Sequence, residues 1–379
     1  MNAFEYRNRQ LHAEEVQLAA LAMRHGTPLF VYSRAALEER FRAYQAPLAG
    51  RPHLICYAMK ANSNLAVLNV LARLGAGFDI VSGGELARAL AAGADPGKII
   101  FSGVGKSIDE MQAALEAGIH CFNVESVPEL ERLSAVAQAM DKVAAISLRV
   151  NPDVDANTHP YISTGLKDNK FGVPIEQALA VYQRALSLPG IHIAGVDCHI
   201  GSQLTSVAPF VEAVEKVAPL ARQLKERHGI EFWSIGGGIG IVYQDSLESG
   251  PSQWWENKPE DERPLTIEQY GREVVPRLKD LGLKILVEPG RFIVGNAGVL
   301  ITRCLYEKKG SAKTFRIVDA GMNDLIRPAL YEGHHEIVPL HKPADISLQK
   351  VDVVGPICES GDFFCQDREL PHFAPGDYV

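Results

Sequence analysis

The sequence predicts an α/β fold, a closed (β/α)₈ barrel of the TIM type joined to a C-terminal β-rich domain. Short apolar runs alternate with helical stretches eight times without interruption, which favours a closed parallel barrel over an open sheet. After about Gly290 the pattern changes to strand-like runs with turn residues and few helical stretches. The length of 379 residues also favours two domains.

The eight predicted barrel strands are short and apolar, as expected for parallel strands that helices cover. They span residues 53–60, 78–82, 99–102, 121–124, 145–150, 193–200, 232–235 and 284–288. The predicted helices span residues 64–74, 85–92, 108–117, a stretch beginning at Pro128, 175–186, 207–227 and 267–279. The barrel domain is therefore expected at residues 35–291.

The second domain is predicted to be a β-sandwich or small barrel formed by residues 1–34 and 292–379. Its predicted strands are residues 298–305, 314–318, 336–340 and 349–354. The barrel domain carries a polar, acidic insertion at residues 245–263 with Trp254 and Trp255 inside it. Such a long connection is either a surface insertion or a functional lid or subunit contact.

Composition narrows the classes of partner. The net charge is −8 and no basic stripe occurs, so nucleic acid is not expected as a partner. No apolar run approaches the roughly 18 residues of a membrane span, and the N-terminus has no secretory pattern. The six cysteines are far apart, which favours reduced thiols in the cytoplasm over a disulfide or zinc framework.

Active sites of such barrels lie at the C-terminal ends of the strands. The polar residues predicted there are Lys60, Asp79, Arg149, His199, Glu288 and Arg291. Closure of the barrel places the first strand beside the eighth, so Lys60 and Glu288 are expected to approach each other. The run Gly236-Gly237-Gly238 follows the seventh strand, where barrels bind phosphate groups.

This combination predicts a site for pyridoxal 5′-phosphate (PLP). A lysine forms the Schiff base, a carboxylate keeps the pyridine nitrogen protonated, and His199 is placed to stack on the ring. Each residue alone has a simpler interpretation, because a single lysine often forms only a salt bridge and Arg149 can be purely structural. Gly105-Lys106-Ser107 is not a phosphate-binding loop, since Ile100 stands where that motif needs glycine. No metal site is expected. His334 and His335 are adjacent, so they cannot share one face of a helix, and no carboxylate or histidine residues have the spacing of metal ligands.

At these residues the sequence resembles the fold-type III PLP-dependent decarboxylases, and within them the members that act on meso-2,6-diaminopimelate. The matching stretches are residues 57–62, 78–85, 159–167, 170–172, 198–203, 236–238, 288–291, 326–331 and 355–362. The resemblance implies decarboxylation of meso-2,6-diaminopimelate to L-lysine and CO₂, the last step of lysine biosynthesis. It also implies a homodimer with shared active sites.

The resemblance implies a role for each matching residue. Lys60, Glu288, His199 and Cys358 are catalytic, with Lys60 forming the Schiff base and Glu288 facing the ring nitrogen. PLP is bound by Lys60, Asp79, His199, Ser202, Gly238, Glu288, Gly290 and Arg291. The substrate is bound by Arg291, Arg327, Tyr331 and Glu359. Cys358 and Glu359 come from the partner subunit.

Three other functions remain open at this point. A decarboxylase for ornithine, lysine or arginine differs only in substrate. A racemase of the same fold should place an arginine at the ring nitrogen, where this chain has Glu288. A non-catalytic PLP-binding protein should lack the second domain. The resemblance also implies strands beyond Pro375-Gly376-Asp377, with a Gly-Ala-Tyr-Gly segment whose tyrosine reaches the site; the sequence in hand ends at Val379.

Overall fold

The computed structural model describes residues 3–155, 164–165, 169–249, 254, 257–259, 263–344 and 347–379. The chain divides into two compact units. The barrel unit is Leu37–Ile241 with Pro264–Gly295, and the sheet unit is Met1–Ala36, Val242–Arg263 and Asn296–Val379. The sequence placed residues 242–263 inside the barrel domain. They group with the sheet unit because Asp245 N donates to Glu336 Oε1 at 2.8 Å and Leu247 packs against that unit's core.

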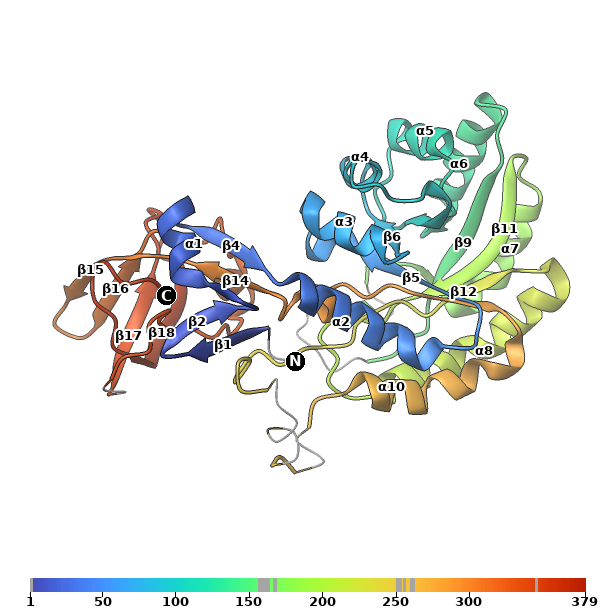
Figure 1. The fold of residues 1–379 in the computed structure, drawn as a ribbon. Coiled ribbons are helices and arrows are strands. Elements are labelled where there is room, and N and C mark those ends of the chain that lie inside the picture. The colour runs from blue at the N-terminus through green and yellow to red at the C-terminus, as the bar shows by residue number, and fades with distance from the viewer. Residues whose placement is uncertain are drawn as a thin grey trace. The chain divides into compact units, whose positions relative to one another are not determined.

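Eight parallel strands form the closed barrel, which confirms the predicted fold class (Figure 1). In spatial order they run β9-β11-β12-β13-β5-β6-β7-β8, and β8 pairs back with β9. Their bounds are β5 His53–Ala58, β6 Gly77–Ile80, β7 Ile99–Phe101, β8 Cys121–Val124, β9 Ala144–Asn151, β11 Ile191–Cys198, β12 Phe232–Ser234 and β13 Lys284–Val287. A short further strand, β10 (Val173–Pro174), pairs with the end of β9.

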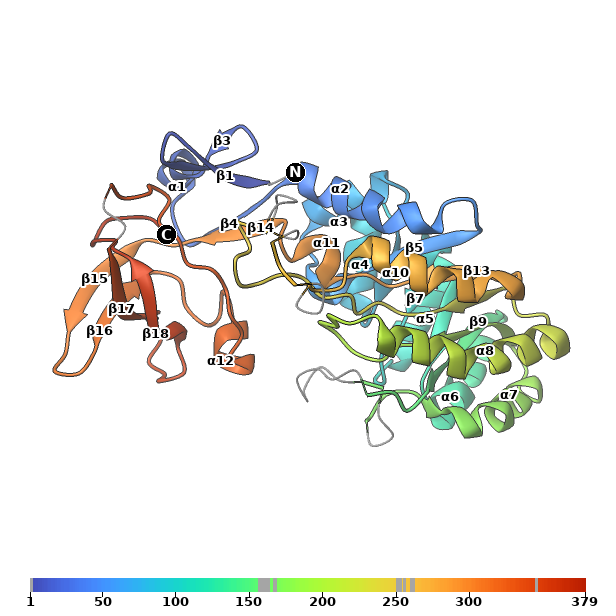
Figure 2. The same cartoon turned by 90° about the horizontal axis from the view of Figure 1, so that it is seen from below.

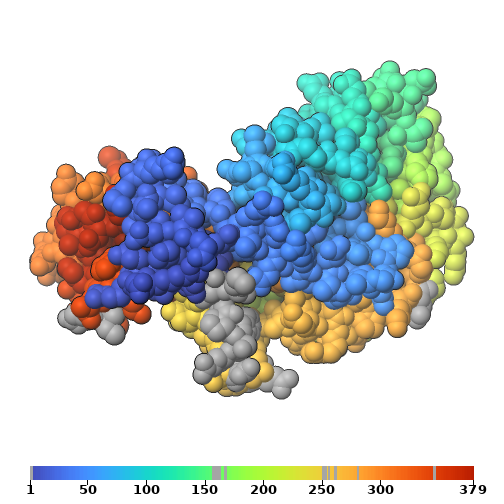
Figure 3. Space-filling view, viewed as in Figure 1, coloured from blue at the N-terminus to red at the C-terminus, as the bar shows by residue number. Residues whose placement is uncertain are grey.

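Helices surround these strands (Figure 2), and Figure 3 shows the surface of one face of the molecule. They are α2 Arg34–Gln45, α3 Leu65–Arg73, α4 Gly83–Ala91, α5 Ile108–Ala117, α6 Val127–Ala139, α7 Ala178–Leu186, α8 Ala208–His228, α10 Ile267–Glu273 and α11 Arg291–Val294. Short 3₁₀ segments are Ala46–Leu48, Met59–Ala61, Pro96–Lys98, Ile175–Gln177 and Val275–Leu281. The helix predicted over 267–279 is therefore α-helical only to Glu273. Pro276 explains this end, because proline has no N–H group to donate the next hydrogen bond of an α-helix.

Three consecutive helices of the barrel unit begin with the sequence Ser-x-x-Glu. Ser82, Ser107 and Ser126 each accept a hydrogen bond from the backbone N–H of the glutamate three residues later, at 3.2–3.3 Å. In α5 the return bond from Ser107 N to Glu110 completes a capping box. These caps fix where α4, α5 and α6 start, and hence the length of the loops at the C-terminal ends of β6, β7 and β8.

Away from its mouth, the barrel interior is filled with apolar side chains. Its core cluster comprises Leu54, Cys56, Ile100, Cys121, Ala194, Phe232 and Leu286. Gly195 lets β11 and β12 approach closely, because a Cβ there would lie 2.5 Å from the Phe232 ring. β11 carries its register shift at the same place, between Ile193 and Gly195.

The sheet unit combines both ends of the chain. Its elements are β1 Phe4–Arg7, β2 Gln10–Ala13, β3 Val16–Gln17, α1 Leu18–His25, β4 Leu29–Tyr32, β14 Gly298–Ile301, β15 Cys304–Lys309, β16 Thr314–Val318, α12 Arg327–Tyr331, β17 Leu348–Val354 and β18 Phe363–Pro371. β4 pairs antiparallel with β14, and a four-stranded sheet runs β15-β16-β17-β18.

The strand predicted at residues 336–340 is wrong, because these residues form no ladder. Pro339 has no N–H to donate, and the segment is held by single bonds from Leu340 N to Tyr378 O and from Leu11 N to Leu340 O. In the insertion, Lys258 Nζ lies 4.4 Å from the centre of the Trp254 ring. Trp255 lies outside the described residues. No helix in the described part of the chain is long and apolar enough to cross a membrane.

Candidate active site at the barrel mouth

Lys60 and Asp79 form an ion pair at the mouth of the barrel. Lys60 lies in the 3₁₀ turn that follows β5, and Asp79 lies in β6 opposite Ala58. Lys60 Nζ is 3.6 Å from Asp79 Oδ2, and the lysine side chain is 55% exposed while the aspartate is 1% exposed. Neither Asp79 oxygen has a hydrogen-bond partner among the described residues. A buried carboxylate in this state attracts a cation, so Asp79 holds the Lys60 amino group at the mouth.

Glu288 lies directly after β13, the strand that pairs with β5. Its backbone N–H donates to Gly236 O at 2.8 Å, and its Oε1 shares a 2.6 Å hydrogen bond with Ser234 Oγ. Burial raises the pKa of the Glu288 carboxyl well above its usual value, and the charges of Asp197 and Asp79 raise it further. The charge of Lys60 acts in the opposite direction and lowers that pKa.

Two residues that the sequence analysis missed connect Glu288 to the other side of the barrel. Asp197 of β11 is the register partner of Arg149 in β9 and of Ser234 in β12. Asp197 is 1% exposed, and Ser234 is completely buried. Burial raises the pKa of Asp197 to about 6, against the opposing charge of Arg149. Arg149, Asp197, Ser234 and Glu288 therefore form a polar row just below the mouth.

His199 follows β11 and is held as a neutral ring. Burial lowers its pKa well below the usual value, and the nearby charges of Arg149 and Lys60 lower it further. Its Nδ1 accepts a hydrogen bond from Gly237 N at 3.3 Å, which places the ring proton on Nε2. Gly236 is required beside it, because its φ is +68° and a Cβ would lie 2.8 Å from His199 Nδ1.

The loops after β11, β12 and β13 carry the predicted phosphate-binding residues. Arg291, at the start of α11, donates through Nε and Nη2 to Ser202 Oγ at 3.2 and 3.1 Å. Gly238 has a φ of +112°, and a Cβ there would lie 2.4 Å from Gly201 O. The loops are joined by the bond from Leu204 N to Gly238 O. Because these three strands are neighbours, Ser202, Gly238, Gly290 and Arg291 lie on adjacent loops.

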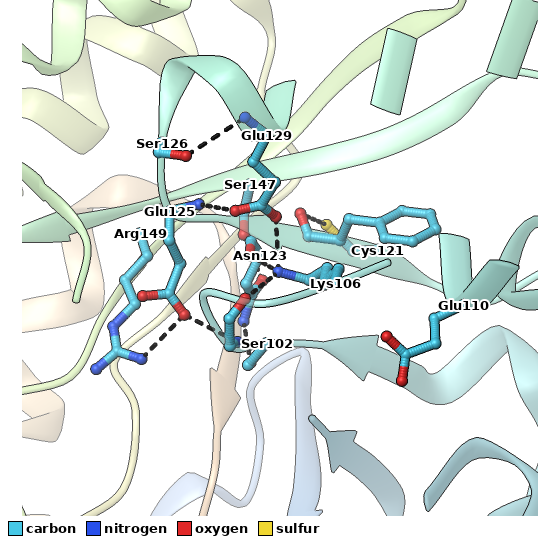
Figure 4. A network of polar contacts seen from close by, with 12 residues as sticks. Ser102, Lys106, Glu110, Cys121, Asn123, Glu125, Ser126, Glu129, Ser147 and Arg149 are labelled. Carbon is cyan, nitrogen blue, oxygen red and sulfur yellow. Dashed lines mark hydrogen bonds and ion pairs between the residues drawn. The ribbon is translucent and has the colours of Figure 1, made fainter. Parts of the chain in front are cut away.

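Arg149 is oriented by Glu125, whose carboxylate joins three segments (Figure 4). Glu125 Oε1 accepts from Gly103 N at 2.8 Å and faces Arg149 Nη1 at 3.5 Å. Its Oε2 accepts from Gly172 N at 3.0 Å. Arg149 also lies over the Phe171 ring, 4.9 Å from its centre. The guanidinium therefore contributes a fixed positive charge to the polar row.

Comparison with known proteins places this geometry in a family. Residues 34–295 match the family model described as pyridoxal-dependent decarboxylase, pyridoxal binding domain. Diaminopimelate decarboxylase of Pseudomonas aeruginosa is 54% identical over 380 residues, covering 100% of this chain and 87% of that protein. The enzyme of the same name from Vibrio cholerae is 52% identical, covering 98% of this chain and 85% of that protein.

The chain belongs to the diaminopimelate decarboxylases.

Solved structures of this family agree with the fold. The crystal structure of diaminopimelate decarboxylase from Helicobacter pylori complexed with L-lysine superposes with a TM-score of 0.86 at 44% identity, covering 96% of this chain and 87% of that chain. The crystal structure of diaminopimelate decarboxylase from M. jannaschii in co-complex with L-lysine gives a TM-score of 0.88 at 35% identity, covering 100% of this chain and 86% of that chain.

The side chains of the barrel fit the PLP of this family. The Lys60 amine lies beside the buried Asp79 carboxylate, whose oxygens accept no hydrogen bond from the described residues. This arrangement suits a Schiff base, because a protonated Schiff-base nitrogen would keep a positive charge next to Asp79. A second buried carboxyl, Glu288, is available for the pyridine nitrogen. Loops whose glycines leave no room for side chains, together with Arg291, suit a phosphate group.

The remaining predicted site residues lie in the sheet unit. Arg327 opens α12, with Nη1 donating to His334 O at 2.9 Å and Cζ 3.7 Å from the centre of the Tyr243 ring. Tyr331 ends the same helix. Cys358 is an exposed free thiol, and Glu359 beside it is exposed as well. The matching stretch 159–163 and residues 166–167 lie outside the described residues.

Proposed function

We propose that this chain is a PLP-dependent enzyme that decarboxylates meso-2,6-diaminopimelate to L-lysine and CO₂. The observation that carries the proposal is the joint placement of Lys60, Asp79 and Glu288 at the mouth of a barrel whose relatives, at 44–54% identity over at least 94% of this chain, are diaminopimelate decarboxylases. L-lysine, the proposed product, is bound in the structures of two diaminopimelate decarboxylases that are 44% and 35% identical to this chain.

Lys60 would hold PLP through a Schiff base, with Asp79 compensating the positive charge on its nitrogen. PLP supplies an electron sink for the pair of electrons left when the carboxylate departs. Glu288 would face the ring nitrogen and keep its proton in place, since a carboxylate is the complementary partner of a pyridinium. An arginine would not do this, which is why Glu288 supports a decarboxylase rather than a racemase.

His199 would lie against the ring face. Its lowered pKa keeps the imidazole neutral at physiological pH, so it adds no positive charge beside the pyridinium. Ser202 and Arg291, together with the loops carrying Gly238 and Gly290, would bind the phosphate. The Arg291 guanidinium already donates to the Ser202 hydroxyl, so both groups would turn as one unit toward a phosphate oxygen.

The sheet unit would supply the substrate-binding groups in a homodimer with shared active sites. The distal end of meso-2,6-diaminopimelate carries both an ammonium and a carboxylate. Arg327 and Glu359 offer the two opposite charges for this zwitterion, and Tyr331 would line the same pocket. Cys358 would return a proton to the carbon that lost CO₂. We further propose a cytoplasmic location, which six unpaired cysteines support.

Substrate assays on the purified protein with PLP test the activity. Release of CO₂ from meso-2,6-diaminopimelate, and at most a small fraction of that rate from ornithine, lysine or arginine, is the expected result. A site built to pair a polar group rejects analogues that lack it by large factors. Faster release from ornithine or lysine would instead support the alternative function, a decarboxylase of another basic amino acid on the same fold.

Lys60→Ala tests the assignment of the Schiff-base lysine. We expect loss of the visible absorbance of bound PLP and of turnover. Lys98→Ala is the matched control, because Lys98 is a partly exposed lysine that pairs with neighbouring Asp95 at 3.9 Å. Full turnover of Lys60→Ala with unchanged absorbance would show that another residue holds the cofactor.

A further inference from the structure

The acidic insertion begins on a second segment of the sheet unit, which carries two adjacent histidines. Asp245 N donates to Glu336 Oε1 at 2.8 Å, and His334 Nε2 lies 3.1 Å from the same oxygen. Two residues before Asp245, the Tyr243 ring meets the His335 ring edge to face, with 5.4 Å between the ring centres. These contacts fix the Tyr243 ring beside the segment that contains both histidines.

The guanidinium of Arg327 lies over the face of the Tyr243 ring. Its Cζ is 3.7 Å from the ring centre, which is within the range of a cation–π contact. Nη1 of the same group donates to His334 O at 2.9 Å and to His335 Nε2 at 3.3 Å. Arginine has no acceptor, so the His335 nitrogen must be the acceptor of this bond. The guanidinium is therefore held by an aromatic face and by two acceptors.

Gly333 leaves the space that this guanidinium occupies. A Cβ at Gly333 would lie 2.7 Å from both Cζ and Nη1 of Arg327. The backbone N–H of Gly333 also donates to Arg327 O at 3.3 Å. On the other side of the segment, His335 O accepts from Arg368 Nη1 at 2.5 Å. The backbone that supports the guanidinium is thus itself tied to the sheet unit.

An arginine held in this way is ordered before a ligand arrives. A long side chain that is free to rotate loses conformational entropy when it binds a carboxylate, and one that the fold has already ordered loses less. In the proposed function Arg327 binds the carboxylate at the distal end of meso-2,6-diaminopimelate, and the inference rests on that assignment. The affinity for this carboxylate should then depend on the residues that hold the guanidinium.

We propose that Tyr243 is a positioning residue, which sets the affinity of the site for the distal carboxylate of the substrate by holding the Arg327 guanidinium against its ring. Tyr243 acts through Arg327 and takes no part in the chemical step. Residues 242–263 belong to the sheet unit, and this contact gives their first residues a role in substrate recognition.

Two ligands of the PLP-loaded protein test the inference. Loss of CO₂ from one end of meso-2,6-diaminopimelate leaves the other end unchanged, so the product L-lysine retains the distal carboxylate. Cadaverine is L-lysine without that carboxylate. We expect the wild type to bind L-lysine more tightly than cadaverine, and calorimetric titration measures both Kd values.

Tyr243→Leu removes the aromatic face. We expect the Kd for L-lysine to rise about tenfold and the Kd for cadaverine to change by less than about twofold, since a shielded cation–π contact has an effect of this order. Tyr243→Phe keeps the ring and should keep the wild-type affinity for both ligands. Tyr306→Leu is the matched control, because Tyr306 is an exposed tyrosine of β15 in the same unit. An unchanged Kd for L-lysine in Tyr243→Leu, or equal losses for both ligands, would overturn the inference.

Gly333→Ala is an independent variant, because it leaves Tyr243 untouched. The added Cβ should displace the Arg327 guanidinium from the ring and from its two acceptors. The Kd for L-lysine should therefore rise, again without an effect on cadaverine. Wild-type affinity for L-lysine in this variant would show that the position of the guanidinium does not matter, which contradicts the inference.

Arg327→Met separates failure of the inference from failure of the proposed function. If Arg327→Met weakens the binding of L-lysine and Tyr243→Leu does not, the inference alone fails. If Arg327→Met leaves the Kd for L-lysine unchanged, the proposed role of Arg327 in substrate binding fails, and the inference fails with it.

Discussion

Lys106 Nζ lies 2.7 Å from Glu129 Oε1, and the two side chains are only 1% and 7% exposed. The ammonium group also donates to Gly103 O at 2.7 Å and to Asn123 O at 2.8 Å, so all three of its protons are used (Figure 4). Glu129 in turn accepts from Glu125 N at 3.0 Å. A lysine that follows a glycine-rich stretch in the sequence is thus a structural cation, which connects the loop after β7 to the start of α6.

Removing this lysine should destabilise the barrel strongly. Lys106→Met leaves Glu129 buried without its cation, and we expect a loss of about 3–5 kcal/mol in the free energy of unfolding. The loss should be smaller at pH 5 than at pH 8, because an unpaired Glu129 can take up a proton. Urea unfolding measures both values. Arg184→Met is the control, since Arg184 and Glu131 are 2.7 Å apart but half exposed, and should cost at most about 1 kcal/mol. Equal losses in the two variants would contradict the prediction.

Much of the barrel could be predicted from the sequence because its strands are short, apolar and regularly spaced. The strand ends then located Lys60, Asp79 and Glu288, since parallel strands present their C-terminal ends on one side. The strand expected at residues 336–340 failed for a different reason. Its apolar residues Ile337, Val338 and Leu340 pack against cores of the sheet unit without pairing along a neighbouring strand, and hydrophobic pattern alone does not distinguish the two cases.

Gly195 is predicted to be required for the packing of β11 on β12. Gly195→Ala places a Cβ 2.5 Å from Phe232 Cε2, and overpacking of this kind costs about 1–3 kcal/mol. Phe232→Leu in the same chain should recover part of the loss, so the double-mutant cycle in urea unfolding should show favourable coupling. Gly105→Ala is the matched control, because nothing lies within 4 Å of its Cβ, and should change stability by less than about 0.5 kcal/mol. Additive losses in the cycle would contradict the prediction.

Asp197 and Ser234 could not be assigned a role from the sequence. Each is a single polar residue within an apolar strand, and the composition of such a strand does not reveal which face the residue lies on. The period of a strand offered a partial signal, because Asp197 lies two residues before His199 and so shares its side of the strand. The register shift at Gly195 interrupts that period lower in the strand, and only the fold shows that Arg149 and Ser234 flank Asp197.

The stability of the PLP-free protein should depend on His199 at acid pH. Its pKa is lowered in the folded chain, so the unfolded chain binds a proton first as the pH falls below about 6.5. The folded state therefore loses stability there, by about 1.4 kcal/mol at pH 5.5 relative to pH 8. His199→Gln has no proton to bind and should lack this part of the loss. Urea unfolding of both proteins at the two pH values measures it, and identical pH dependence would show that His199 titrates normally in the fold.

The turn that carries Cys358 and Glu359 depends on one buried carboxylate. Asp362, which is 4% exposed, accepts from Met322 N at 2.6 Å through Oδ1 and from Ile357 N at 2.7 Å through Oδ2. It thereby ties the turn to the loop after β16. Because both oxygens accept backbone protons, an amide in its place would direct N–H groups at one of the two donors.

Asp362→Asn should therefore displace Cys358 and Glu359 while leaving every proposed PLP-binding residue unchanged. We expect kcat for meso-2,6-diaminopimelate to fall by about tenfold to a hundredfold, because small misplacements of catalytic groups have effects of this size. The absorbance and affinity of bound PLP should stay at wild-type values. Asp352→Asn is the control, since Asp352 also accepts a backbone proton, from Asp367 N at 2.6 Å, but lies on β17. If Asp362→Asn lowers the unfolding free energy and leaves kcat unchanged, the turn is structural and the proton donor must be sought elsewhere.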